Sequence, residues 1–271
     1  MSEDALIYEK VGKTALITLN RPRYKNALDA SLMQAMPAAI RSARQDPGVA
    51  SVVLTGAGGA FCSGAQLVDG GAEAEKSLSA REFLLDVHRW FADLVDLEKP
   101  VVAAVDGVAF GAGFSLALGA DFIVASDRAR FCAGFARLGL LPDLSLLYML
   151  PRLVGLARAK EIAFSARDIA ADEALQMGFV QAVVPAERLL PAALAFARRF
   201  DDAPTAVLGL TKSVLNRSFE SDRQGLAQLE TALQGLLAGS RYHAEAVQRF
   251  LAREAPVYGG APRFDAAAAA E

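Results

Sequence analysis

The chain has 271 residues, of which 53% are hydrophobic and 22% charged, and its 28 basic and 31 acidic residues give a net charge of -3 at pH 7. This composition is typical of a globular protein with enough apolar side chains for one large core or two modest ones. No segment concentrates Lys and Arg, which excludes the basic surface of a nucleic-acid-binding protein, so we expect no nucleic-acid partner.

Cysteine and histidine are too scarce for a metal centre. Cys62 and Cys132 stand far apart without a CxxC pair, and the chain has only 2 histidines, so we predict no metal site and a reducing, cytoplasmic location. The N-terminal residues carry acids where a signal peptide carries bases, and the uncharged stretch Gly107 to Ala120 is too short and glycine-rich to span a bilayer. We expect neither secretion nor membrane insertion.

Hydrophobic periodicity predicts a strand and a helix near the start of the chain. Alternation over Thr14 to Leu19 predicts the strand, which the turn-forming segment Asn20 to Pro22 closes. A second apolar strand, Val52 to Leu54, leads into a glycine-rich loop from Gly56 to Gly71. Between the two strands, a helix is predicted whose apolar face carries Leu32, Met36, Ala39, Ile40 and Ala43.

The same order then recurs. A helix is predicted over Glu73 to Glu98, and Val101 to Val105 follows it as a buried strand. The next glycines turn the chain into a helix of small residues that begins near Ala112, and Phe122 to Ala125 is another short strand. The apolar stripe of the first of these helices is Phe83, Val87, Trp90, Phe91 and Leu94.

Helices dominate the rest of the chain. Pro142 and Asp143 introduce a predicted helix from Leu144 to Leu150 that stops at Pro151, and Phe179 to Val184 is a late strand. After residue 200 only amphipathic helices are predicted, such as Val207 to Val214 and Leu226 to Leu237. We therefore predict an α/β layered fold with a core over residues 1–200 and an appended helical region over residues 201–271.

Two glycine-rich loops can present free backbone N–H groups to an anion, one at Gly64 to Gln66 and one at Gly111 to Gly113. The spacing does not fit a dinucleotide fingerprint, because Phe61 and Leu116 stand where the third glycine belongs. Neither loop ends in the GK[ST] of a phosphate-binding loop. By themselves such loops are more often tight packing turns than catalytic features, so their spacing does not decide the function.

The segments AFCSGAQL (Ala60 to Leu67) and KPVVAAVDGVAFGAGFSLALGADF (Lys99 to Phe122) resemble the two signature loops of the crotonase, or enoyl-CoA hydratase/isomerase, superfamily. Further segments resemble family motifs in the same order: NRPRYKNAL (Asn20 to Leu28), GLLPDLSLLYMLPRLVG (Gly139 to Gly155) and ALQMGFVQAVVP (Ala174 to Pro185). The resemblance implies an α/β crotonase-like spiral of ββα turns, with a C-terminal helical region that packs between subunits in homotrimers or dimers of trimers.

The resemblance also implies an acyl-CoA thioester substrate, in which coenzyme A arrives with the substrate and no separate cofactor is needed. The thioester oxygen accepts two backbone N–H groups in the family, and the matching positions here are Ala65 and Ala112. A backbone donor does not depend on which side chain the residue carries. Other positions implied to contact substrate are Gly64, Gln66 and Gly111 beside these donors, and Arg23 and Lys25 for the phosphates, although solvated surface charge explains the last two equally well.

The positions that match the two glutamates of enoyl-CoA hydratases are Ser115 and Phe135, neither of which can act as an acid or base at neutral pH. Asp143 matches the aspartate of family isomerases, including dienoyl-CoA isomerases and the ring-epoxide isomerase of phenylacetate degradation. The segment Leu251 to Gly260 also resembles the C-terminal part of the ring-epoxide isomerase. In an apolar pocket with Phe135 and Leu140, this carboxyl should have a raised pKa, take a proton from one carbon and return it to another. Helix N-capping is the structural alternative for Asp143.

Two other residues have alternative explanations. Ser115 lies in a segment that approximates the GxSxG elbow of hydrolases, but the second glycine is missing and the preceding strand ends ten residues earlier, which favours a small helix residue facing the pocket. His88 lies on a mostly apolar predicted helix, where a packed histidine is the usual finding. Its placement nevertheless resembles that of the base histidine in the family's aromatic acyl-CoA dehalogenase, whose nucleophilic aspartate falls at Asp143.

We therefore predict an enoyl-CoA isomerase that moves a double bond or opens a ring through a thioester enolate, with Asp143 as acid and base. The alternatives are a dehalogenase or thioesterase that uses Asp143 as nucleophile and His88 as base, and a non-catalytic acyl-CoA binder.

Overall fold

In the computed structural model, which describes residues 4–67 and 74–261, a parallel sheet forms the centre of the protein. Residues 68–73 include the end of the predicted glycine loop and Glu73, the predicted first residue of a helix, and these lie outside the described residues. Only the edge pair, β1 with β2, is antiparallel among the pairings of this sheet in the described residues. Its order is β1 (Leu6–Val11), β2 (Thr14–Leu19), β3 (Ser51–Gly56), β4 (Val101–Val105), β6 (Phe122–Ser126) and β9 (Ala182–Val184).

A second, smaller sheet holds short strands that follow those of the first. Its order is β5 (Val108–Phe110), β7 (Arg130–Cys132) and β8 (Ile169–Ala170). The strand β4 enters the large sheet, β5 enters the small one and the helix α3 (Ala112–Leu118) follows; β6 and β7 repeat this step before α4 (Leu146–Val154). This repeat is the ββα turn that the resemblance implies.

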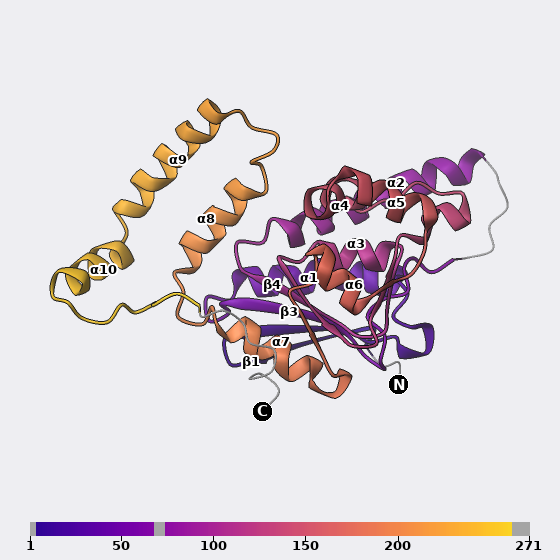
Figure 1. Ribbon diagram of the computed structural model, residues 1–271, viewed down its shortest axis with the longest axis horizontal. Helices are drawn as coiled ribbons and strands as arrows, with labels where there is room; N and C mark the ends of the chain where they lie inside the picture. Colours follow the sequence, from indigo (N-terminus) through magenta and orange to yellow (C-terminus); the bar gives the residue numbers. More distant parts are fainter. Residues whose placement is uncertain (1–3, 68–73, 262–271) are drawn as a thin grey trace.

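Helices cover both faces of the large sheet (Figure 1). Along β3, Val52 and Leu54 pack into the larger core, whereas Val53 faces α7 (Leu189–Arg198) on the opposite side, as period-2 alternation requires. All five apolar residues predicted for the first helix are buried on α1 (Ala30–Gln45). The other helices of the larger core are α2 (Ala74–Val95), α5 (Leu156–Ser165) and α6 (Ala171–Met177), together with α3 and α4.

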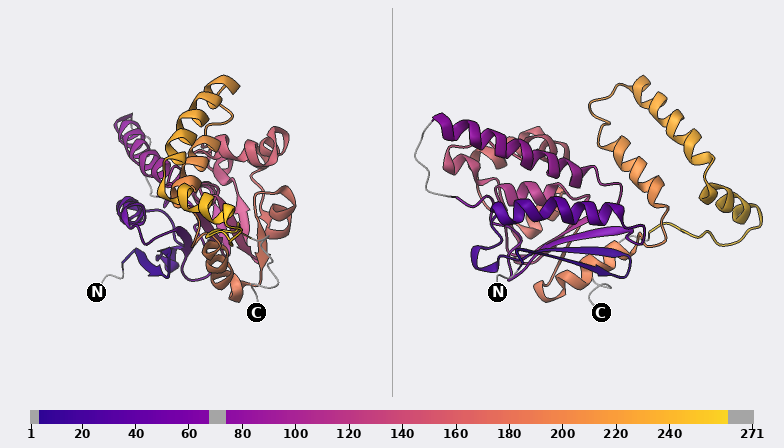
Figure 2. Two further views of the ribbon diagram at one scale, coloured as in Figure 1. Left: turned by 90° about the vertical axis from the view of Figure 1, so that its left-hand side faces the viewer. Right: turned by 180° about the vertical axis from the view of Figure 1, so that it is seen from behind.

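The C-terminal helices extend away from this body, as Figures 1 and 2 show. They are α8 (Thr205–Leu215), α9 (Arg223–Ala238) and α10 (Arg241–Leu251). No residue of α9 or α10 is buried, and Phe250 and Leu251 at the end of α10 are mostly exposed. Among the described residues, no helix is both long enough and apolar enough to cross a membrane.

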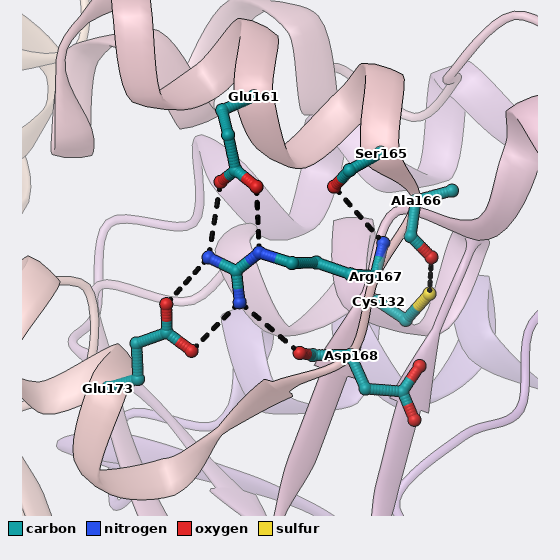
Figure 3. Close-up of polar contacts among 7 residues, drawn as sticks. All are labelled: Cys132, Glu161, Ser165, Ala166, Arg167, Asp168 and Glu173. Atoms are coloured by element: carbon teal, nitrogen blue, oxygen red, sulfur yellow. Dashed lines mark hydrogen bonds and ion pairs between the residues drawn. The ribbon is translucent and has the colours of Figure 1, made fainter.

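An ion-pair clamp joins α5 and α6 (Figure 3). The Arg167 guanidinium contacts the carboxylates of Glu161 on α5 and Glu173 on α6, with the shortest distances to each at 2.7 and 2.6 Å.

The two cysteines are free and buried, and burial raises the pKa of the Cys62 thiol to about 12. The Cys132 thiol donates to the backbone oxygen of Ala166 at 3.1 Å.

Several sequence-based predictions of elements were wrong. The helix predicted to end at Glu98 ends at Val95, and Phe83 of its predicted apolar stripe is 46% exposed. The edge strand β1 was missed, and the late strand is limited to Ala182–Val184. The helix predicted from Leu144 to Leu150 instead spans Leu146–Val154 and contains Pro151, which lies near its C-terminal end. Pro151 is the sixth residue of this helix, and because it has no N–H to donate, the Leu147 oxygen loses its partner within the helix. The short helix continues past Pro151 to Val154 despite this lost hydrogen bond.

Candidate active site

The two glycine-rich loops run side by side. Cys62 forms an isolated parallel bridge with Ala109, in which the Cys62 N–H donates to Val108 at 2.9 Å and the Phe110 N–H donates to Cys62 at 3.0 Å. Gly64 follows at a φ of +102°, with the Phe110 oxygen directly beside it. The sequence therefore places two separately predicted loops next to each other through backbone hydrogen bonds.

Each loop carries a free backbone donor. Ala112 is the first residue of α3, so its N–H has no acceptor within the helix. Around Ala65, the Leu28 N–H donates to Gly64 and the Gln66 N–H donates to Leu28, which leaves the Ala65 N–H on the other side of the chain. Within residues 4–67 and 74–261, neither the Ala65 nor the Ala112 N–H has a hydrogen-bond acceptor. Two such donors can bind an oxygen that gains negative charge.

A buried asparagine braces the first loop. The Asn26 side chain is 0% exposed; its amide donates to the backbone oxygens of Ala57 and Ala60 at 2.9 and 2.7 Å, and its oxygen accepts from the Arg21 N–H. The Arg21 guanidinium in turn donates to the Gln66 side chain at 2.8 Å. The sequence analysis did not identify Asn26 and Arg21 as parts of the site. For Asn26, the signal was a polar residue directly before two apolar ones in the segment NAL.

Arg23 and Lys25, predicted to meet the phosphates of coenzyme A, lie on the outer side of the same turn. Both side chains are exposed, and neither forms a salt bridge within the part of the chain that the structure describes. The Lys25 backbone oxygen accepts from the Ser63 N–H at 2.9 Å, which ties this turn to the first loop. Two unpaired positive charges thus flank the loop that carries Ala65.

Asp143 lies just before α4 and does not cap it. The N-cap residue is Ser145, so the N-cap alternative for Asp143 is wrong. The Asp143 Oδ1 atom is buried and has no hydrogen-bond partner among the described residues. Burial raises the pKa of this carboxyl, while the charge of His88 and a hydrogen bond from its own backbone N–H lower it. A half-buried carboxyl that has one unpartnered oxygen and a raised pKa is suited to accept and return a proton.

Of the residues at the two hydratase glutamate positions, Ser115 lies on α3 and Phe135 lies near Gly111, which precedes that helix. The Ser115 hydroxyl contacts the backbone oxygen of Asp143 at 2.9 Å. The ring of Phe135 is buried, and its Cζ lies 3.9 Å from where a Cβ of Gly111 would stand. Leu140, expected to line the pocket, is instead 56% exposed. Ser115 lies inside a helix with its proton engaged by a backbone oxygen, which is not the arrangement of a hydrolase elbow.

A cavity of about 860 Å³ lies between α2, α4 and α8, and Asp143 is not among its lining residues, although Ser145, two positions later, is. His88 lines it from α2, although the His88 side chain is exposed rather than packed as expected for an apolar helix. Ser145 and Met149 line it from the start of α4, and Lys212 lines it from α8. Its lining is mainly apolar, with residues such as Phe91, Leu118, Phe122, Ile123, Phe179 and Leu208. Within the described residues, no cluster of three or more His, Cys, Asp or Glu side chains could hold a metal ion.

Comparisons with known proteins agree with this arrangement. A family model described as enoyl-CoA hydratase/isomerase matches residues 9–261. A probable enoyl-CoA hydratase of Rhodobacter capsulatus is 37% identical and covers 96% of this chain and 100% of its own, and the 1,2-epoxyphenylacetyl-CoA isomerase of Escherichia coli is 34% identical and covers 90% and 94%. The crystal structure of an enoyl-CoA hydratase/isomerase from Cupriavidus metallidurans has a TM-score of 0.86 at 36% identity, and covers 98% of this chain and 100% of that one. The predicted fold is confirmed.

Proposed function

Because the chain belongs to the enoyl-CoA hydratase/isomerase family, we propose that it is an enoyl-CoA isomerase that works through a thioester enolate, with Asp143 as acid and base. The observation that carries this proposal is the buried, unpartnered Oδ1 of Asp143. Ser115 and Phe135 stand at the positions that match the hydratase glutamates, and neither side chain is a carboxylate. The relatives include proteins named as hydratases and one named as an isomerase, so their names do not favour one reaction over the other. The proposal of an isomerase therefore rests on the residues of this chain.

The proposed reaction moves one proton. For a 3-enoyl-CoA, the Asp143 carboxylate removes a proton from the α carbon, and the electron pair spreads over the diene and the thioester oxygen. The Ala65 and Ala112 N–H groups stabilise that oxygen, a contribution of about 3 kcal/mol for one such donor. The protonated Asp143 returns the proton to the γ carbon, so the double bond becomes conjugated with the thioester and the enzyme regains its carboxylate. Coenzyme A arrives with the substrate, and Arg23 and Lys25 bind its phosphates.

A panel of 3-enoyl-, 2-enoyl- and aryl-CoA thioesters tests this function. We expect 3-enoyl-CoA to gain the absorbance of a conjugated thioester, without the increase in mass that addition of water produces. In deuterated water, we expect deuterium at the γ carbon of the product in the turnovers in which protonated Asp143 exchanges with solvent before it returns the proton. Asp143→Asn should lower kcat by about a thousandfold, because general acid–base catalysis contributes about 10²–10⁴, and should still bind acyl-CoA. Retained activity in that variant would reject Asp143 as the base, and binding without turnover in the wild type would indicate an acyl-CoA binder.

A hydrolytic reaction is the second candidate, because the charge of His88 acts on Asp143 and His88 lines the cavity between α2, α4 and α8. In that reaction the Asp143 carboxylate attacks an aryl carbon and displaces halide, or attacks the thioester carbon and displaces the thiolate. Water activated by His88 then hydrolyses the covalent ester or anhydride. A covalent intermediate detected by mass spectrometry after brief incubation with a halogenated aryl-CoA would favour this reaction, and its absence together with isomerisation would exclude it.

We also propose that copies of this chain bind one another as a homotrimer or a dimer of trimers. This proposal is supported by the exposed apolar side chains of the C-terminal helices, which include Leu229, Leu236, Phe250 and Leu251. No residue of α9 or α10 is buried. An isolated amphipathic helix pair gains little stability without a partner surface. Light scattering coupled to gel filtration should give three or six times the mass of the 28.6 kDa chain, and a monomer would contradict the proposal.

A further inference from the structure

The Ser115 hydroxyl joins α3 to the turn that carries Asp143. The Ser115 side chain is 0% exposed, and its Oγ lies 2.9 Å from the backbone oxygen of Asp143 and 3.4 Å from that of Gly111. The Gly111 oxygen already accepts the N–H groups of Phe114 and Ser115. Because a hydroxyl donates a single proton, the shorter contact identifies the Asp143 oxygen as its acceptor.

The turn that begins at Asp143 has an unfavourable backbone. The Leu146 N–H donates to the Asp143 oxygen at 3.1 Å, and between them Leu144 and Ser145 have φ angles of 47° and 59°. Turns with positive φ at both central residues are dominated by Gly, Asn and Asp, and other residues in this region cost about 1–3 kcal/mol each. The Leu144 side chain is 1% exposed in the core. Core packing therefore holds the middle of the turn, and Ser115 holds its first carbonyl.

Ser115 also lies three residues after Ala112 on α3, and residues at this spacing share one face of a helix. One turn of α3 thus carries a free N–H donor and the hydroxyl that holds the Asp143 backbone. We propose that Ser115 is a positioning residue for Asp143, an inference that rests on the proposed function. Its hydroxyl keeps the Asp143 carboxyl at a fixed place relative to the Ala112 N–H and so to the carbons of the bound thioester, and it does not touch the substrate.

The test compares Ser115→Ala with Ser115→Cys, whose thiol is a weaker donor of similar size. We expect Ser115→Ala to lower kcat about 10- to 100-fold, since small displacements of a catalytic group have effects of that size. KM for the enoyl-CoA should stay within about twofold, because the N–H donors and the phosphate-binding residues are unchanged. Ser115→Cys should regain part of kcat. The matched control is Ser51→Ala, which removes another buried hydroxyl, 3.1 Å from that of Thr14, in the sheet.

Amide hydrogen exchange gives a readout that does not depend on turnover. We expect peptides covering residues 139–150 to exchange faster in Ser115→Ala than in the wild type, with the rest of the chain unchanged, and no such change in Ser51→Ala. Unchanged kcat or unchanged exchange of this segment in Ser115→Ala would overturn the proposal, as would faster exchange over the whole chain. A wild type that converts no enoyl-CoA would instead reject the proposed function, and the exchange measurement would still decide the role of Ser115.

Discussion

A Cβ atom at Gly64 would lie 3.6 Å from the backbone nitrogen of Ala112 and only 2.8 Å from the backbone oxygen of Phe110. The two loops can approach this closely only because the residue between them has no side chain. Gly64 also has a φ of +102°, a conformation that favours glycine. The relative position of the two free N–H donors therefore depends on this glycine.

We predict that Gly64→Ala separates the loops and lowers kcat/KM at least about tenfold, because displacement of an oxyanion donor costs about that much or more. The matched control is Gly178→Ala. Gly178 also has a positive φ, +90°, but a Cβ there would meet nothing within 4 Å, so this variant carries backbone strain without a clash. Steady-state kinetics and thermal unfolding of the two variants check the prediction. Equal activity in both would contradict it.

Asp143 should reduce stability at neutral pH. Burial raises its pKa in the folded protein, so the protonated form favours folding below the ordinary pKa of an aspartate, and this advantage is lost as the pH rises through the raised value. We predict that Asp143→Asn, which cannot ionise, has a higher Tm than the wild type at pH 7. The difference should shrink as the pH falls toward about 4, where the unfolded aspartate also becomes protonated.

Thermal unfolding measured between pH 4 and pH 8 would test this, with Asp222→Asn as an exposed control for the general effect of a lost aspartate. A Tm of Asp143→Asn that is equal to or below the wild-type value at pH 7 would show that the carboxylate is not disfavoured there. The result would also separate the effect of Asp143 on the stability of the protein from its role in turnover, because catalytic groups are often retained at the expense of stability.

Asn26 should stabilise the first glycine-rich loop and with it the folded protein. Asn26→Ala leaves the backbone oxygens of Ala57 and Ala60 without the donors that lie 2.9 and 2.7 Å away. We predict a loss of about 2 kcal/mol in the free energy of unfolding, because buried groups left without partners carry such a penalty. Asn20→Ala removes an exposed amide contact to Asp4 in the same region and should cost much less. Urea unfolding measures both variants, and similar losses would contradict the assigned role.

The ion pair between Asp121 and Lys212, at 2.8 Å, should hold α8 against the body and so shape the cavity. Burial raises the pKa of Asp121, and the nearby Lys212 charge opposes that shift. Lys212→Met leaves this carboxyl with the Val101 N–H as its remaining donor and should destabilise the protein by about 3 kcal/mol. Adding Asp121→Asn should restore part of that loss. Chemical unfolding of Lys212→Met, Asp121→Asn and the double variant checks this. If the changes in the free energy of unfolding of the two single variants add up to that of the double variant, the two charges do not interact.

The sequence predicted the elements whose period is local. Alternation identified Thr14–Leu19 as β2, and the apolar face of α1 was identified residue by residue, because side chains on a strand or helix repeat at fixed intervals. The glycine loops and the start of α3 at Ala112 followed from backbone requirements that residue types reveal. The family resemblance, confirmed by the comparisons, added the order of the elements.

Contacts between distant segments were decided only by the tertiary structure. The short strands β5, β7 and β8 carry too few residues for a period to be recognised, and they form because neighbouring segments offer hydrogen-bond partners. The start of α4 depends on the positive φ angles of Leu144 and Ser145, which their residue types disfavour and which core packing enforces. The contact of Ser115 with Asp143 joins residues 28 positions apart, and no local pattern specifies that distance.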